Sequence, residues 1–167
     1  MGRSKKNQIA DLTESYQAKL WTPFAVLGIK TEEDWLTAID YLPADTPTLA
    51  PQTLLAKEVC RQLQAYLTAP DFRFDLSLHI GGTTHQQRVW QAIQAIPSGE
   101  TSSYAEIATQ LHSAPRAVGR ACGANRIPII IPCHRVIAKN GGLGGFMNAS
   151  DGDPLEIKRW LLRHEST

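Results

Sequence analysis

The stretch Ser103–Asn125, SYAEIATQLHSAPRAVGRACGAN, decides how the second half of this chain folds. Ser103 and Glu106 have the spacing of a capping box. In that motif the serine hydroxyl accepts from an amide of the first turn, while the glutamate reaches back to the amide of the serine. A helix should therefore begin after Ser103 and run to about Leu111.

A second helix start follows within a few residues. Ser113 can serve as its N-cap, and Pro115 falls in its first turn, where no amide hydrogen is needed. We expect this helix to end near Ala124, with Asn125 in the left-handed turn that terminates it. Two short helices joined by about two residues form a helix-turn-helix. Because many helical hairpins bind nothing, the pattern alone is a weak indication of DNA binding.

The residues around this helix pair predict an α+β fold. Segments with the composition or the alternation of β-strands are Thr22–Ile29, Leu36–Leu42 and Phe72–Leu78. Segments with apolar residues at helical spacing are Pro51–Leu67, Gln86–Ile96 and Pro154–Glu165. We expect a flexible tail over residues 1–8, a small sheet-plus-helix domain over 9–81, and a mostly helical domain with the helix-turn-helix over 82–167.

The charge distribution favours a polyanionic partner for the second half of the chain. The formal net charge is only +1, but no Asp or Glu occurs from Ile107 to Ser150. The cations of this window are Arg116, Arg120, Arg126, Arg135 and Lys139. A carboxylate beside a phosphate would repel it, so an acid-free window of this length suits a polyanion. The alternative is a neutral-to-basic surface without a partner, and charge alone does not separate the two.

Composition and cysteine usage argue against several other classes of protein. With 43% hydrophobic and 20% charged residues, the chain can bury an ordinary core. No apolar run approaches the ~20 residues that span a bilayer, and the polar N-terminus lacks a secretory signal. Cys60, Cys122 and Cys133 form no Cys-x-x-Cys pair, and the histidines have no familiar zinc spacing, so we expect neither metal nor cofactor. A cytoplasmic protein with reduced thiols is the simplest interpretation.

Cys133 is the candidate reactive residue, within the run Ile129–Ile137, IIIPCHRVI. A cysteine between apolar β-branched residues is in general a small buried hydrophobe. Three features argue for chemistry here: a proline precedes it, His134 and Arg135 adjoin it, and it lies in the acid-free window. Adjacent cationic groups lower the pKa of a thiol, so we expect an ionised and solvent-reachable sulfur. The other two cysteines lie on expected helices without such neighbours, and we interpret both as structural.

This run resembles the active-site signature of a known family. Pro132–Val136, PCHRV, is the signature of the O6-alkylguanine-DNA alkyltransferases, also called methylated-DNA–protein-cysteine methyltransferases. Further matching segments follow in family order: Gly82–Trp90, Pro97–Tyr104, Arg116–Gly119, Asn125–Pro128 and Lys158–Glu165. The resemblance covers residues 82–167, while the first half of the chain matches the family only in the order of its elements.

The resemblance implies that Cys133 accepts an alkyl group from O6 of guanine in one irreversible step. His134 would take the thiol proton through a water molecule, and Glu165 would hold that imidazole charged and oriented. Tyr104 would donate a proton or a hydrogen bond to the guanine, and Asn125 would join the two helices and reach toward the thiolate. Without the resemblance, Glu165 is a solvated helix-end charge, Tyr104 a packing residue and Asn125 a plain helix terminator.

The resemblance also implies double-stranded DNA, bound in the minor groove, as the partner. Arg116 would enter the base stack after the O6-alkylguanine is flipped out, because the alkyl group is out of reach within the duplex. Small residues on the second helix would allow close approach to the groove, although they also suit tight helix packing. The expected DNA contacts are Arg116, Ala117, Gly119, Arg120, Ala121, Gly123, Arg126 and Arg135.

A pocket for the flipped base is expected beside the signature. Its expected lining is Tyr104, Cys133, Val136, Phe146 and Met147. The glycine-rich run 141–146 would form its far wall, since glycine allows close backbone approach. The chain departs from the family pattern at four places: Phe146 replaces a common tyrosine, Met147 a small or polar residue, His85 a frequent phenylalanine, and residues 148–153 are expanded.

The sequence therefore predicts repair of alkylated DNA by a monomer that acts once, because the thioether has no leaving path. Two alternatives stay open. A non-catalytic alkyltransferase-like damage binder would share the helix pair and its arginine, but such proteins lack the reactive cysteine. A cysteine hydrolase would turn over esters or amides and ignore DNA, and the arginine-bearing helix pair would have no purpose in it.

Overall fold

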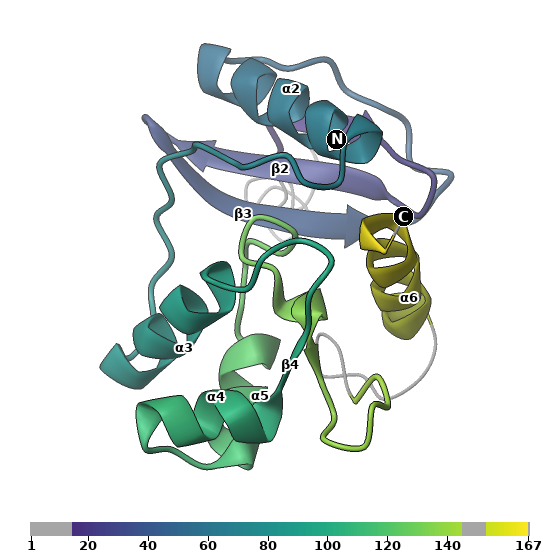
Figure 1. Ribbon diagram of the computed structural model, residues 1–167. Helices are drawn as coiled ribbons and strands as arrows, with labels where there is room; N and C mark the ends of the chain where they lie inside the picture. The colour runs from purple at the N-terminus through teal and green to yellow at the C-terminus, as the bar shows by residue number, and fades with distance from the viewer. Residues whose placement is uncertain (1–14, 145–152, 167) are drawn as a thin grey trace, which may run out of the picture.

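The chain forms an α+β structure built around one antiparallel sheet, as the sequence predicts. A computed structural model describes residues 15–144 and 153–166. The sheet has the order β1-β2-β3, with β1 at Ala18–Trp21, β2 at Val26–Glu32 and β3 at Trp35–Leu42. Helix α2, Leu54–Thr68, covers one side of the sheet, and the later helices lie on the opposite side (Figure 1).

The sheet has one edge strand, β1, that the sequence does not predict. Strands β2 and β3 overlap the two expected segments, but Thr22 closes a turn before β2, where its Oγ1 accepts from the amide of Ala25 at 3.1 Å. Strand β1 is not predicted by the sequence, because four residues of mixed polarity carry no readable alternation. The β2–β3 turn holds Glu33 at a φ of 53°.

The expected strand over Phe72–Leu78 is wrong. Its apolar side chains are partly buried and alternate with exposed residues, which is the pattern that suggested a strand. Its backbone, however, meets the sheet only at an isolated bridge between Leu36 and Leu78. Instead, the side-chain amide of Gln62 on α2 accepts from the amide of Asp75 at 2.9 Å and donates to its carbonyl at 3.0 Å. A buried side chain thus satisfies backbone groups that a strand partner would otherwise take.

The predicted helix-turn-helix is confirmed. Helices α3, α4 and α5 span Thr84–Gln94, Tyr104–Leu111 and Pro115–Gly123. Ser103 caps α4 by accepting from the amide of Glu106 at 3.0 Å, but the Glu106 carboxylate accepts from Ser102 at 3.1 Å, so the reciprocal half of the box is not formed. A complete capping box begins α3 instead, between Thr83 and Gln86.

Two predicted details of the turn are wrong. The N-cap of α5 is Ala114, without a side-chain cap, because the Ser113 hydroxyl is hydrogen-bonded to Nε2 of His85 at 2.7 Å. The left-handed residue is His112, with a φ of 52°, at the end of α4. Asn125 is therefore not the left-handed terminator of α5, and its side chain has a different use.

The reactive signature lies between the helix pair and the C-terminal helix. A single 3-10 turn, η1, spans Cys133–Arg135, and β5, Val136–Ile137, pairs in parallel with β4, Ser102–Ser103. Helix α6, Asp153–Glu165, follows. Buried residues of both halves form one continuous core, and the amide of Ile39 in β3 donates to the carbonyl of Arg126 at 2.9 Å. The division of the chain between residues 81 and 82 stays a prediction. Every helix in the described ranges is too short or too polar to cross a bilayer.

Candidate active site

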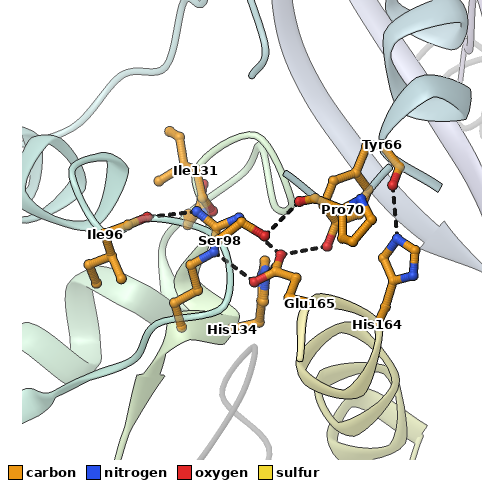
Figure 2. A network of polar contacts seen from close by, with 10 residues as sticks. Tyr66, Pro70, Ile96, Ser98, Ile131, His134, His164 and Glu165 are labelled. Carbon is orange, nitrogen blue, oxygen red and sulfur yellow. Dashed lines mark hydrogen bonds and ion pairs between the residues drawn. The ribbon is translucent and has the colours of Figure 1, made fainter. Parts of the chain in front are cut away.

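A buried carboxylate, Glu165 in the last turn of α6, organises the site (Figure 2). Its side chain is 2% exposed, and its Oε2 accepts from the Tyr66 hydroxyl at 2.6 Å and from Nε2 of His134 at 2.7 Å. Arg135 donates to both carboxylate oxygens, from Nε at 2.8 Å and from an Nη at 2.9 Å. Burial alone would raise the pKa of Glu165, but the hydrogen bonds from His134, Arg135 and Tyr66 hold it well below the usual range. Glu165 is an ionised, fully engaged carboxylate, and the interpretation as a solvated helix-end charge is excluded.

His134 is oriented by Glu165 but is not charged in this state. Burial, opposed by the hydrogen bond and charge of Glu165, lowers the pKa of His134 below its usual range. An ionised carboxylate can only accept, so the hydrogen must lie on Nε2, which leaves a lone pair on Nδ1. Within residues 15–144 and 153–166, Nδ1 is buried and has no hydrogen-bond partner in the protein. His134 is therefore a neutral base at rest with one accepting nitrogen, the state in which it can take the thiol proton.

The Cys133 sulfur is buried and neutral, which corrects the expectation of an exposed thiolate. The residue is 3% exposed. A hydrogen bond with the Cys122 thiol and then burial raise the pKa of Cys133 well above its usual range, against the lowering effects of Asn125 and Lys158. Cys122 is consequently a neighbour of the reactive sulfur and not a remote structural residue. Nearness in sequence misled here, because Arg135, two residues after Cys133, directs its guanidinium to Glu165.

Asn125 reaches the sulfur, as expected. Its Nδ2 donates to Sγ of Cys133 at 3.2 Å and to the carbonyl of Ile131 at 2.9 Å, while Oδ1 accepts from the amide of Ile127 at 2.9 Å. Two of these partners, Ile127 and Ile131, lie between α5 and η1, and the third, Cys133, begins η1. One side chain therefore fixes the end of the helix pair relative to the nucleophile.

Lys158 is a buried cation that sequence reasoning left without a role. Its Nζ donates to the carbonyls of Val136 at 2.7 Å and Leu143 at 2.5 Å, and burial lowers its pKa to about 8. Its Nζ also lies 5.9 Å from the centre of the Tyr104 ring. The available signal was its position: Lys158 lies three residues after Leu155 and three before Leu161, on the apolar face of α6.

Tyr104 begins α4 and lies beside Gly144, in the glycine run expected to form the pocket wall, and near Gly119 of α5. A Cβ on Gly144 would lie 2.9 Å from Cε2 of Tyr104, and one on Gly119 would lie 4.0 Å from Cε1. Burial, with smaller contributions from Cys122 and Cys133, raises the pKa of the Tyr104 hydroxyl, so it remains a hydrogen-bond donor. Val136, the first residue of β5 directly after η1, is fully buried. Phe146, Met147 and the expanded run 148–152 lie outside the described residues.

The expected DNA-contacting residues divide into exposed and buried groups. Arg116, Arg120 and Arg126 are exposed, and Ala117, Gly119 and Gly123 are partly exposed. Ala121 is 1% exposed, and its carbonyl accepts from the Trp90 indole at 2.8 Å, so this small residue serves helix packing and not DNA contact. The Arg135 side chain is 11% exposed, and it donates to Glu165 and to the carbonyl of Ile96 at 2.7 Å. Arg135 is thus taken out of the expected DNA surface.

Comparisons with known proteins decide the family. A family described as "6-O-methylguanine DNA methyltransferase, DNA binding domain" matches residues 84–167. A Bacillus subtilis protein named methylated-DNA–protein-cysteine methyltransferase, constitutive, is 40% identical over 161 residues, covering 90% of this chain and 95% of that protein. This chain belongs to the methylated-DNA–protein-cysteine methyltransferase family.

Two further similar proteins match nearly the whole chain. A methylated-DNA–protein-cysteine methyltransferase of Methanosarcina acetivorans is 35% identical and covers 91% of this chain and 99% of its own length. A crystal structure of Mycobacterium tuberculosis OGT in complex with DNA matches with a TM-score of 0.75 and 39% identity, covering 89% of this chain and 91% of that chain. The N-terminal half is therefore part of the family's architecture, and its similarity extends beyond the order of elements that the sequence alone indicated.

The sequence missed one polar group of this methyltransferase site entirely. Tyr66 is at the same helical spacing as Val59 and Leu63, which predicts a core residue, and its ring is indeed buried. Nothing in the spacing indicates that its hydroxyl meets Glu165, which lies 99 residues later. A buried tyrosine needs a partner for its hydroxyl, and that requirement was the only available signal.

Proposed function

We propose that this chain repairs alkylated DNA by transferring an alkyl group from O6-alkylguanine in a duplex to Sγ of Cys133. The observation that carries the proposal is the hydrogen bond of 3.2 Å from Nδ2 of Asn125 to Sγ of Cys133. This contact fixes a nucleophile at the end of an arginine-bearing helix pair. The relatives from Bacillus subtilis and Methanosarcina acetivorans are named for this activity. The protein would act as a monomer, once per molecule.

The chemistry follows from the protonation states of the site. The Cys133 sulfur forms a bond to the alkyl carbon as the bond from that carbon to O6 breaks, and the electron pair of the broken bond stays with the guanine. The thiol proton passes to Nδ1 of His134 through a water molecule, and Glu165 stabilises the imidazolium that forms. Tyr104 donates a hydrogen bond to the guanine ring as negative charge develops there. Because the resting thiol is neutral, proton removal must accompany the transfer.

DNA binding is assigned to helix α5 and the residues that follow it. Arg116 lies at the exposed start of α5, where it can enter the stack and pair with the base that the flipped guanine leaves. Arg120 and Arg126 are exposed and can contact phosphates, while Ala117, Gly119 and Gly123 allow close approach to a minor groove.

The decisive experiment is methyl transfer from a duplex oligonucleotide that contains O6-methylguanine. We expect one added methyl mass on the peptide that holds Cys133, at one equivalent per protein molecule. Cys133→Ser should abolish transfer while the protein still binds the duplex. Cys60→Ser is the matched control, because Cys60 is also a buried thiol, with a pKa raised to about 11 by burial, but lies on α2.

Three outcomes would contradict the proposal. Binding of the damaged duplex without any added mass would favour the non-catalytic damage binder. Hydrolysis of esters or amides, with neither binding nor repair of DNA, would favour the cysteine hydrolase. Repair that continues beyond one equivalent, or that survives in Cys133→Ser, would exclude Cys133 as the final acceptor.

A further inference from the structure

The Tyr66 hydroxyl belongs to the N-terminal half of the chain, yet it hydrogen-bonds the carboxylate at the centre of the site (Figure 2). Tyr66 is 1% exposed near the end of α2. Its own carbonyl is hydrogen-bonded to Nε2 of His164 at 2.8 Å, and the two rings meet edge to face at 5.2 Å. His164 therefore contacts both the backbone and the ring of Tyr66, whose hydroxyl is directed at Glu165.

The hydroxyl and the imidazole share one acceptor atom. Tyr66 Oη and His134 Nε2 both donate to Oε2 of Glu165, at 2.6 and 2.7 Å. A hydrogen bond donated to a carboxylate oxygen partly offsets its negative charge. The carboxylate then stabilises the protonated form of the neighbouring imidazole less strongly, which lowers the pKa of His134. Burial raises the pKa of Tyr66 far above its ordinary value, so the hydroxyl keeps its proton and can act only as a donor to Glu165.

We propose that Tyr66 is a positioning residue for alkyl transfer, whose hydroxyl moderates Glu165 and so keeps His134 neutral and able to accept the thiol proton. This inference rests on the proposed function and adds a role for the N-terminal half of the chain. Without the hydroxyl, Oε2 of Glu165 would keep Arg135 and His134 as its donors. Its charge would then act more strongly on His134, and the imidazole would be protonated at a higher pH. A protonated His134 has no free lone pair on Nδ1, so it could not take the proton of Cys133.

Other charged and titratable groups also face this pair. They are Tyr41 of β3, Arg135 of η1, and Lys158 and His164 of α6. All of these side chains are retained when only the Tyr66 hydroxyl is removed. Tyr66→Phe also keeps the ring that packs against Phe74 and His164. A change in the pH dependence of the variant therefore reports the hydroxyl itself.

The test is the single-turnover rate of methyl transfer from an O6-methylguanine duplex, measured from about pH 5.5 to about pH 9. For Tyr66→Phe we expect the acidic limb to move to higher pH by roughly half a unit to one unit. On that limb the rate should fall about threefold to tenfold, which is the same shift expressed as a ratio. On the alkaline plateau it should stay within about twofold of the wild type, because there the imidazole is neutral in both proteins.

Tyr16→Phe is the matched control, because Tyr16 also donates to a carboxylate in the N-terminal half, that of Asp40 at 2.7 Å. Its pH profile should coincide with that of the wild type. Site-specific 3-fluorotyrosine at position 66 covers the case in which Tyr66→Phe does not fold. Its more acidic hydroxyl donates more strongly, so the acidic limb should move to lower pH.

The outcomes separate this inference from the proposed function. Suppose that the wild type transfers methyl groups and that the pH profile of Tyr66→Phe coincides with its profile, or that Tyr66→Phe loses the same fraction of rate at every pH. Either result would overturn the role of Tyr66 and leave the proposed function intact. A fluorotyrosine profile that does not move, or moves to higher pH, would overturn it as well. No transfer by the wild type at any pH would instead remove the proposed function.

Discussion

Replacing Arg135 by methionine should destabilise the protein far more than the loss of an ordinary surface arginine. Arg135 donates twice to the carboxylate of Glu165 and once to the carbonyl of Ile96. Methionine fills similar space but supplies no donor, so Glu165 would stay buried with only Tyr66 and His134 as partners. Removing one partner of a buried ion pair costs about 3–5 kcal/mol of folding free energy. For a chain of this length, that loss lowers the midpoint of thermal unfolding by roughly 6–20 °C.

The assay is thermal and urea unfolding followed by circular dichroism, with Arg61→Met as the matched control. Arg61 forms an exposed pair with Glu58 within α2, so we expect no measurable change in the midpoint. The sign of the pH dependence gives a second check. The lowered pKa of Glu165 contributes stability above about pH 4.3, and this contribution is lost as the pH falls further. The difference between wild type and Arg135→Met should therefore shrink in acid. Equal midpoints for the Arg135 and Arg61 variants at neutral pH would refute the reasoning.

Two further predictions concern the lysine and the glycine beside Tyr104. The pKa of Lys158 is lowered to about 8, so between that pH and its unfolded value the unfolded chain binds more protons and stability should rise with pH. Lys158→Met should remove about 2–3 kcal/mol of that rise between pH 8 and pH 10, measured as the difference between two urea titrations; equal slopes would contradict it. Gly144→Ala would place a Cβ against the Tyr104 ring and should slow methyl transfer by about tenfold or more. Gly141→Ala has the same left-handed strain but meets nothing within 4 Å, so its transfer rate should be normal, and equal slowing in both variants would remove the Tyr104 contact as the cause.

Local patterns predicted the elements that depend on local interactions. The helix pair follows from the Ser103 cap and from Pro115, because capping and the fixed φ of proline act within a few residues. The alternation at Phe72–Leu78 also predicted its partial burial correctly, yet the strand was wrong because Gln62 of another element takes its backbone hydrogen bonds. Alternation reports which side chains are buried, but it does not report what the backbone pairs with.

The sequence predicted which residues form most of the site, but it did not predict their protonation states. The signature indicated Cys133 and His134, the matching segment Lys158–Glu165 indicated Glu165, and Asn125 does contact the sulfur. The expectation of a thiolate was wrong because pKa values depend on burial and on the direction of side chains, and neither is visible in sequence. Arg135 lies two residues after Cys133 in the chain, but its guanidinium pairs with Glu165, 30 residues later. Tyr66 could not be assigned for the same reason, since its partner lies in the other half of the chain.

The shared core has a consequence for how this chain can be rearranged. A fragment that begins at α3 would retain Cys133, His134 and Glu165, but it would expose apolar surface that the sheet and α2 now cover. The two halves should consequently melt together, and neither is an interchangeable module. A chimera that takes its N-terminal half from a relative would need to carry over both the complementary apolar surface and a hydroxyl at position 66. Any change that weakens the packing between the two halves would thus alter the reactivity of the Cys133 sulfur, although Cys133 belongs to the C-terminal half alone.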